Sequence, residues 1–369
     1  MGEIDHWHPV LRSDALRTRP VGVRLAGHEI VLFRAEDGAL GALEDRCPHR
    51  GMRLSLGRVE GARLVCSYHG WRWSAEGRGE SPGTPAMRPC ARRYDVAERH
   101  GMIWVKRAGV TASFPYLEVD GWFEVGRLSH RAQAPLEVVL DNFTEVEHTP
   151  STHLLLGYPA GRMAEVETRV AMTDEAVHVH NEGPQRKLPR VIQALFGIPD
   201  EARFVDSWIT RFSPVHCVYD QYWLDPVTGE RAGDALRIAV FFNPLGPEET
   251  EIVSLAYASV PPWRGLGLGA LHLRLTRALV DVEVRRDCAV LAGLADKQPG
   301  LVGRALGRFD SALVASRRRI ARIYRGEMGG PGSGEGAPVS SRRAPSGSNP
   351  LRSVGGPPSG SFRADRRGG

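Results

Sequence analysis

The amino-acid sequence predicts an α+β protein built from two folded parts and a C-terminal tail. Short β-prone runs separated by glycine-containing turns fill residues 1–109, whereas strand-like runs followed by long helical patterns fill residues 110–326. Strands grouped before helices along the chain indicate an α+β domain. The length of 369 residues also fits two to three domains.

The first part is predicted to be an all-β domain. The β-prone runs at 21–25, 29–34 and 40–44 are separated by Gly27-His28 and Glu36-Asp37-Gly38, which are hairpin signals. A later pair of runs, 94–98 and 102–106, is joined by Arg99-His100-Gly101. Loops held by such a sheet are suitable places to grip a cofactor and expose part of it.

The second part is predicted to begin with a helix over residues 136–147, because its apolar residues recur with the helical period and Pro150 follows closely. An antiparallel sheet is expected next. Helices are then expected from Leu266 to about Ala295 and over residues 301–325. The strand-like runs of the sheet are 164–172, 176–180, 204–212, 215–224, 235–242 and 251–259.

Composition and charge exclude several classes of protein. The chain is 42% hydrophobic and 25% charged, has no apolar run of membrane-spanning length, and shows no signal peptide at its N-terminus. We therefore expect a cytoplasmic protein, and five cysteines fit a reducing compartment. Residues 327–369 contribute +3 of the net charge of +5 and are rich in Gly, Pro, Ser and Arg, so we expect a disordered tail and no nucleic-acid partner.

Two short blocks, Cys47-Pro48-His49 and Cys66-Ser67-Tyr68-His69, carry the strongest chemical signal. Each supplies one thiolate and one imidazole, which together make the ligand set of a Rieske [2Fe–2S] centre. A structural Zn²⁺ site and scattered core residues are the alternatives. The tight Cys-x-His spacing and the glycine that follows each histidine block favour the binuclear cluster.

A second constellation lies between Glu145 and His153, where His148 and His153 flank Pro150. Two imidazoles and a carboxylate with open positions form the facial triad of non-haem Fe(II) oxygenases. Alone, these histidines are as well explained as ordinary residues at a helix end. A one-electron carrier in the same chain favours iron, because reductive activation of O₂ needs electrons delivered singly.

With both constellations in order, the chain resembles the Rieske non-haem iron oxygenases, namely the α subunits of aromatic-ring hydroxylating dioxygenases and O-demethylase-type monooxygenases. The resemblance covers residues 6 to 325. It rests on Trp7-His8-Pro9-Val10, on Cys47-Pro48-His49-Arg50-Gly51, on Cys66-Ser67-Tyr68-His69-Gly70-Trp71, and on Glu145-x-x-His148-x4-His153. It implies a Rieske domain followed by a helix-grip (Bet v 1-like) catalytic domain, a homotrimer or α3β3 assembly, and an external reductase, sometimes with a ferredoxin.

The resemblance also implies roles for single residues. Glu145 stands where the family commonly has Asp, and it is expected to bridge His148 to the cluster ligand His69 of a neighbouring subunit. The third iron ligand is expected late in the chain, and Asp287 matches the family's segment best, with Asp281 as the alternative. Ser67, in a position where the family commonly has Pro, leaves the cluster ligands intact.

The expected function is therefore oxygenation of an apolar or aromatic small molecule with O₂ and electrons that reach NAD(P)H only through a separate reductase. Monohydroxylation, demethylation and cis-dihydroxylation share one ligand sphere, so the motifs leave the choice open. A rival from another class is an electron-transfer protein fused to an iron-free ligand-binding domain. The aromatic and aliphatic residues expected to be available for the pocket are Leu154, Leu155, Leu156, Leu195, Phe196, Trp208, Phe212, Tyr219 and Trp223.

Overall fold

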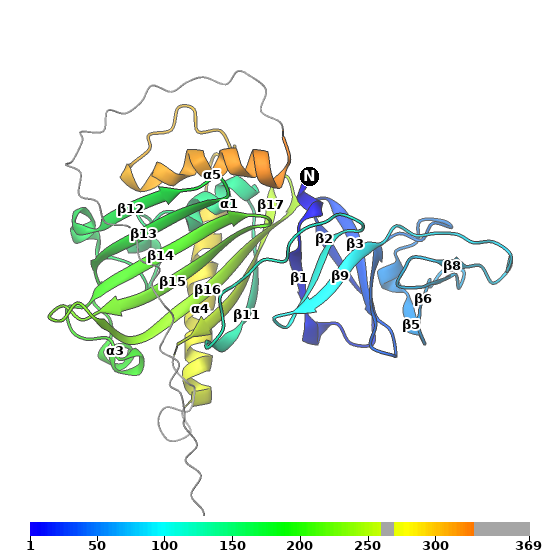
Figure 1. The fold of residues 1–369 in the computed structure, drawn as a ribbon, viewed down its shortest axis with the longest axis horizontal. Coiled ribbons are helices and arrows are strands. Elements are labelled where there is room, and N and C mark those ends of the chain that lie inside the picture. The colour runs from blue at the N-terminus through cyan, green and yellow to red at the C-terminus, as the bar shows by residue number, and fades with distance from the viewer. Residues whose placement is uncertain (260–268, 328–369) are drawn as a thin grey trace, which may run out of the picture. The chain divides into compact units, whose positions relative to one another are not determined.

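The computed structural model describes residues 1–259 and 269–327, and residues 1–328 form one compact unit. The predicted α+β class is confirmed. An all-β part comes first, and a large antiparallel sheet wrapped around a long helix follows it (Figure 1).

The all-β part consists of three small antiparallel sheets. One has the order β1-β10-β9, the second β2-β3-β4 and the third β5-β6-β7-β8. The strands are β1 (His8–Arg12), β2 (Val21–Leu25), β3 (His28–Arg34), β4 (Leu40–Glu44), β5 (Arg58–Glu60), β6 (Arg63–Val65), β7 (Arg72–Trp73), β8 (Gly79–Glu80), β9 (Tyr94–Arg99) and β10 (Met102–Arg107).

The large sheet has seven strands in the order β11-β17-β16-β15-β14-β13-β12. They are β11 (Phe123–Ala132), β12 (Glu167–Met172), β13 (Ala176–Pro184), β14 (Arg203–Phe212), β15 (Val215–Leu224), β16 (Arg231–Gly246) and β17 (Glu249–Ala258). The α-helices are α1 (Leu136–Phe143), α2 (Thr149–Thr152), α3 (Arg190–Phe196), α4 (Gly269–Ala292) and α5 (Leu313–Arg319).

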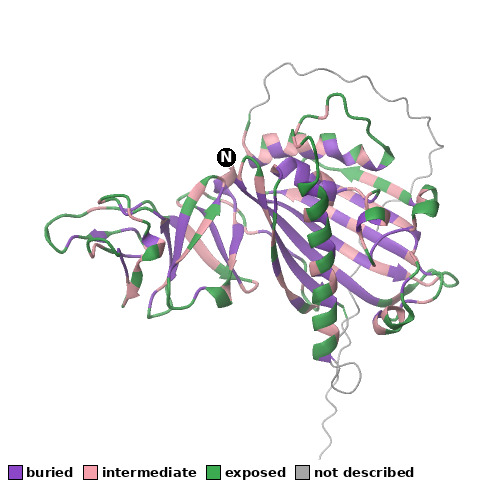
Figure 2. Cartoon of the chain, turned by 180° about the vertical axis from the view of Figure 1, so that it is seen from behind, coloured by how far each residue is buried: buried purple, intermediate pink, exposed green. Residues whose placement is uncertain are grey.

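Helices α1 and α4 pack against one face of the large sheet. Their apolar residues, among them Val139, Val280 and Val284, share a core with inward residues of β14, β15 and β16. Alternation along the strands places one set of side chains in this core. Figure 2 shows α4 with exposed residues on its outer side, so only one stripe of the helix enters the core.

The opposite face of the large sheet packs on the all-β part through Trp104 and Phe241, whose rings make an edge-to-face contact. Nearby, His8 Nδ1 lies 2.9 Å from Asn243 Oδ1 on β16, and Asn243 donates to the Pro9 carbonyl. Burial lowers the pKa of His8 to about 4, so the ring is neutral at pH 7. These bonds fix the N-terminal strand to the large sheet.

Several element boundaries differ from the sequence prediction. The first helix ends at Phe143 rather than Glu147, because the Thr144 hydroxyl donates to the Leu140 carbonyl and closes the last turn. Pro150 is the second residue of the short helix α2, in the first turn, where a backbone N–H has no partner within the helix. Strand β11 was not predicted.

The C-terminal prediction of one helix over 301–325 is wrong. A 3₁₀ turn (Arg308–Ala312), helix α5 and a π-helical turn (Ile320–Tyr324) take its place. The predicted start at Leu266 lies outside the described residues, as does the predicted disordered tail from residue 328 onward. Among the described residues, no helix is both long and apolar enough to cross a bilayer.

Candidate metal centres

The Cys47 and Cys66 blocks lie in two loops, residues 47–52 and 66–71, which we call the cluster loops. Each loop makes the same turn. The cysteine carbonyl accepts from the glycine four residues on, at 2.8 Å for Gly51 and 3.1 Å for Gly70. Each cysteine N–H donates 2.8 Å to the carbonyl five residues on. Gly51 and Gly70 both have a left-handed φ, at 72° and 69°, which explains the glycine after each histidine block.

The four side chains of the cluster loops gather at one place. Cys47 and Cys66 are 1% and 2% exposed, and burial raises the pKa of the Cys47 thiol, with the adjacent Cys66 acting in the same direction. The rings of His49 and His69 lie 4.5 Å apart, and His49 also stacks on Trp71. His69 is exposed.

This donor set fits a Rieske cluster. Two thiols are buried side by side, and two imidazoles lie together nearer the surface. His49 Nδ1 is buried and has no hydrogen-bond partner in the described part of the chain. A buried ring nitrogen without a partner is costly unless a metal uses its lone pair.

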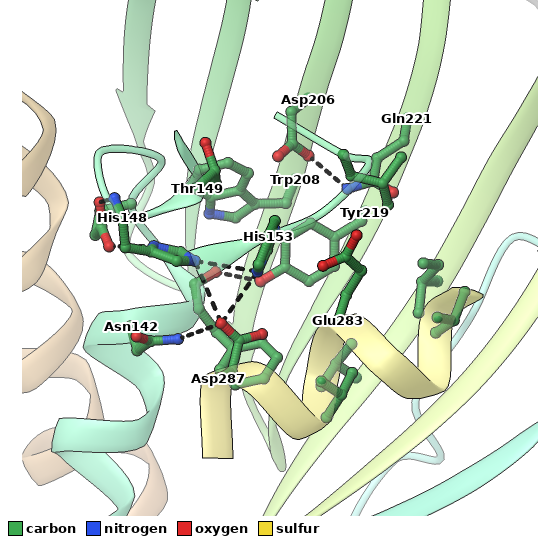
Figure 3. A pocket seen from close by; sticks show the side chains of 17 residues that line it. Asn142, His148, Thr149, His153, Asp206, Trp208, Tyr219, Gln221, Glu283 and Asp287 are labelled. Atoms are coloured by element: carbon green, nitrogen blue, oxygen red, sulfur yellow. Dashed lines mark hydrogen bonds and ion pairs between the residues drawn. The ribbon is translucent and has the colours of Figure 1, made fainter. Parts of the chain in front are cut away.

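The second centre is formed by His148, His153 and Asp287, which we call the triad. His148 precedes α2, His153 follows it, and Asp287 lies on α4. His153 Nε2 is 3.1 Å from Asp287 Oδ1, and the two Nε2 atoms are 3.3 Å apart. His148 Nε2 is 3.3 Å from the same carboxylate oxygen. The three ligand atoms converge as a metal site requires (Figure 3).

The electrostatics of the triad favour a bound cation. Burial opposes ionisation of both His148 and Asp287. Hydrogen bonds to Asp287 and Glu145 nevertheless raise the pKa of His148 to about 10, and the two histidines lower the pKa of Asp287 to about 2. The Asp287 carboxylate is therefore ionised beside the two imidazoles. A divalent cation would replace the proton that these groups share.

Two further side chains hold the triad in place. Glu145 Oε1 accepts from His148 Nδ1, which leaves Nε2 facing the triad. Asn142 Nδ2 donates 3.1 Å to Asp287 Oδ1. Glu145 was predicted from the sequence, whereas Asn142 was not, and its position at the end of helix α1 gives no signal of its partner on α4.

Asp281, the alternative third ligand, lies elsewhere. Its carboxylate accepts from His130 Nε2 on β11 at 2.9 Å and pairs with Arg285. Six residues of helix separate Asp281 from Asp287, so the two side chains lie on different faces. Glu283, one turn before Asp287, accepts the N–H groups of Leu154 and Leu155 at 2.9–3.2 Å and so anchors the segment after His153.

The triad lies at a cavity of about 600 Å³, its mouth included, between the large sheet and α4. Most of the wall is apolar or aromatic, and of the predicted pocket residues Leu156, Trp208 and Tyr219 contribute to it. Phe196 and Trp223 line a separate, smaller cavity with Leu155, while Leu154 is about half exposed.

Two polar residues of the cavity were missed by sequence reasoning. Asp206 on β14 and Gln221 on β15 are direct cross-strand partners, and Gln221 Nε2 donates 3.2 Å to Asp206 Oδ1. Burial raises the pKa of Asp206 to about 6, against the lowering effect of that hydrogen bond. The available signal was a carboxylate in the inward row Phe204, Asp206, Trp208 of a strand.

Comparison with known proteins gives one domain match. Residues 6–106 match the Rieske [2Fe–2S] domain. The vanillate O-demethylase oxygenase subunit of a Pseudomonas species is 34% identical over 176 residues, or 44% of this chain and 49% of that protein. The 3-chlorobenzoate-3,4-dioxygenase oxygenase subunit of Comamonas testosteroni is 40% identical over 127 residues, or 31% and 29% of the two chains. The chain thus spans about half the length, or less, of these relatives.

Solved structures share the fold over more of the chain. Dicamba monooxygenase bound to 3,6-dichlorosalicylic acid superposes with a TM-score of 0.72 at 17% identity, covering 87% of this chain and 97% of that one. NdmA of Pseudomonas putida CBB5 with caffeine gives 0.64 at 20% identity, covering 86% and 90%. At these identities the likeness establishes the fold: an all-β domain followed by a helix-grip domain.

Proposed function

We propose that this chain is a Rieske non-haem iron oxygenase, and that it uses O₂ and externally supplied electrons to hydroxylate or demethylate an apolar or aromatic small molecule. The observation that carries the proposal is the triad. Two imidazoles and a carboxylate come from segments 134 residues apart. Their ligand atoms lie within 4.8 Å of one another at the wall of a largely apolar cavity.

The residues present fit both iron groups. Cys47, His49, Cys66 and His69 would hold the [2Fe–2S] cluster, and His148, His153 and Asp287 would hold a mononuclear Fe(II). When bound, these groups supply the chemistry that side chains lack, which is one-electron transfer and activation of O₂. A substrate in the cavity would lie beside the triad, where the apolar walls exclude water.

The protein's own contribution is orientation. Glu145 accepts the Nδ1 proton of His148 and fixes its tautomer, which leaves the Nε2 lone pair for the metal. Asn142 restrains the Asp287 carboxylate, and Glu283 restrains the backbone after His153. These contacts hold three ligands in place and leave the remaining positions around the metal open to O₂ and substrate.

We further propose that Glu145 joins the triad to the cluster of a neighbouring copy, in a homotrimer. Glu145 and His148 line two hollows: the cavity described above and a second groove that α1, α4 and α5 help to form. The described lining of the groove holds four carboxylates against two arginines, so its balance is acidic: Asp141, Glu145, Glu147 and Asp310 against Arg304 and Arg317. The cluster loops and their flanks instead expose several arginines: Arg46, Arg50, Arg53 and Arg72. Opposite charges on the two surfaces support such docking.

The electron supply belongs to the same proposal. In the single chain His69 and Tyr68 are exposed on the second cluster loop. The part of the cluster loops that the neighbouring copy leaves uncovered is where we expect a reductase, with or without a ferredoxin, to deliver electrons. We expect NAD(P)H to act only through that reductase, and we expect the assembly to work in the cytoplasm.

Metal content and isotope labelling test the function together. Protein reconstituted anaerobically should hold three irons and two sulfides per chain. After reduction by a surrogate reductase it should place ¹⁸O from ¹⁸O₂ into products of an aromatic and natural-product panel. Two irons per chain with an intact cluster spectrum would instead support the electron-transfer rival. Two labelled oxygens in the product indicate dihydroxylation and one indicates monohydroxylation. Demethylation leaves the product unlabelled and releases one equivalent of formaldehyde.

A further inference from the structure

The polar pair Asp206 and Gln221 interrupts an otherwise apolar wall of the substrate cavity. Both side chains lie on the inner face of the sheet and are 7% and 8% exposed. Their inward neighbours on the two strands are aromatic: Phe204 and Trp208 on β14, and Tyr219 and Trp223 on β15. Apolar residues at these two positions would complete the core without burying a carboxyl group, which is energetically costly.

The pair leaves hydrogen-bonding capacity unused. Gln221 donates its amide N–H to Asp206, but its Oε1 is buried and has no partner among residues 1–259 and 269–327. Trp208 Nε1, at the next inward position of β14, is a buried donor that likewise lacks a partner in that part of the chain. Both residues line the cavity, as does Asp206 (Figure 3). A ligand that reaches these two side chains would meet an unpaired acceptor and an unpaired donor.

The charges around the cavity restrict the ligand further. Its described lining holds three carboxylates besides Asp287, namely Glu145, Asp206 and Glu283, and no lysine or arginine. Apart from the triad, an anionic ligand would find no cationic side chain among these lining residues and would face three carboxylates, so its binding is disfavoured. A neutral hydroxyl group can both donate and accept, and it matches the unused groups.

We propose that the cavity selects an uncharged, largely apolar molecule whose hydroxyl group donates a hydrogen bond to Gln221 Oε1 beside Asp206. Asp206 acts as a positioning residue, since its carboxylate holds the Gln221 amide with Oε1 free. This inference rests on the proposed function, because it takes the cavity beside the triad to be the substrate site. It adds the class of substrate and the end by which the substrate is held.

Calorimetric titration of the anaerobic holoenzyme with three matched probes tests the proposal without turnover. The probes are 4-propylphenol, its methyl ether 4-propylanisole, and 4-propylbenzoate. We expect the phenol to bind about tenfold more tightly than the ether, the loss typical of one buried hydrogen bond, and the benzoate to bind most weakly. Equal affinity for phenol and ether, tightest binding of the benzoate, or no phenol binding up to about 5 mM would each overturn the proposal.

The substitution Gln221→Met removes the acceptor and keeps the side-chain volume. It should therefore bring the ratio of the phenol affinity to the ether affinity close to one. Ser207→Ala, on the opposite face of β14, should leave the ratio unchanged. A ratio that survives Gln221→Met also overturns the proposal. If that variant does not fold, the wild-type ratios still decide. Iron counted on the same samples separates the two failures, because loss of the substrate class leaves three irons, whereas failure of the oxygenase function leaves two.

Discussion

The cluster loops and the triad hold their metal-binding side chains in opposite ways. In the cluster loops, the four candidate ligands come from two stretches of backbone that make the same turn, and His69 is exposed. In the triad, the ligands come from segments 134 residues apart, and Asp287 is buried. Side chains on other elements, Asn142 and Glu145 among them, hold the triad in place. The difference fits the proposed function, in which one centre would meet an external electron donor and the other would exclude water.

The largest expected effect separates the two centres completely. Asp287→Ala should remove the mononuclear iron and abolish turnover, because only two imidazoles remain, while the visible absorption of the cluster persists. Iron-to-sulfide ratio and absorption spectra measure both. Asp281→Ala is the matched control on the same helix and should keep three irons per chain. Full iron in Asp287→Ala would show that the triad is not the metal site.

Glu145→Gln should act on the link between the centres. The variant keeps its shape but lacks the charge that accepts from His148 Nδ1. All three irons should remain, while turnover coupled to the reductase should fall by about 100-fold, the upper range for a residue behind a metal ligand. Single-turnover reoxidation of the reduced cluster measures the step. Glu175→Gln, exposed before strand β13 and outside the groove, is the control. Retained coupling in Glu145→Gln would refute the bridging role.

Asn142→Ala should weaken the triad without breaking it. Asp287 loses the donor at 3.1 Å, so its carboxylate becomes freer to turn away from the metal. We expect about a tenfold loss of Fe(II) affinity, at the lower end of such effects. Competition with a chelator gives the affinity, and the cluster spectrum serves as an internal control. Unchanged affinity would mean that the ligands alone fix the geometry, as in the cluster loops.

Asp206→Asn should show how much folding stability the buried Asp206 carboxylate costs. Burial raises the pKa of Asp206 in the folded state to about 6. The wild type therefore loses stability as pH rises from about 4 to 6, whereas Asn does not ionise. The variant's advantage should grow over that window and level off at about 2–3 kcal/mol. Thermal unfolding from pH 4.5 to 8 measures it, and an advantage independent of pH would contradict the burial of a charge.

Gly51→Ala should have the smallest effect, and that effect should be on the cluster loops. An added Cβ meets no atom within 4 Å, so only the left-handed backbone at φ 72° opposes it. The expected cost is about 1–2 kcal/mol of stability, with faster loss of the cluster on heating. Gly83→Ala is the control, since its Cβ also meets open space and its φ is not left-handed.

The two centres also differ in how far the sequence revealed them. The cluster ligands form two short blocks, and His148 and His153 are five residues apart. Their spacing in the chain was therefore enough to identify them as candidates. Asp287 came through resemblance to a family segment. Asn142, Glu283 and Gln221 act through partners that lie far from them along the chain or across a sheet, and no local pattern marks such pairs.

Element boundaries were missed for local reasons. The helix predicted to reach Glu147 ends at Phe143, where a threonine hydroxyl competes for a backbone carbonyl, and that early end lets His148 turn toward the triad. Strand β11 escaped prediction because its residues alternate only weakly between buried and exposed positions. Tertiary pairing with β17 and packing under α4 determine this strand more than its composition does.

One helix fixes two of the three ligands of the triad. Asp287 on α4 is a ligand itself, and Glu283, one turn away, grips the backbone that follows His153. A small roll or slide of α4 therefore carries the carboxylate and the second histidine along together, and the spacing between them is preserved while the sheet behind the cavity deforms. Because the four-residue helix α2 joins His153 to His148, a displacement of α4 would reach all three ligands of the triad.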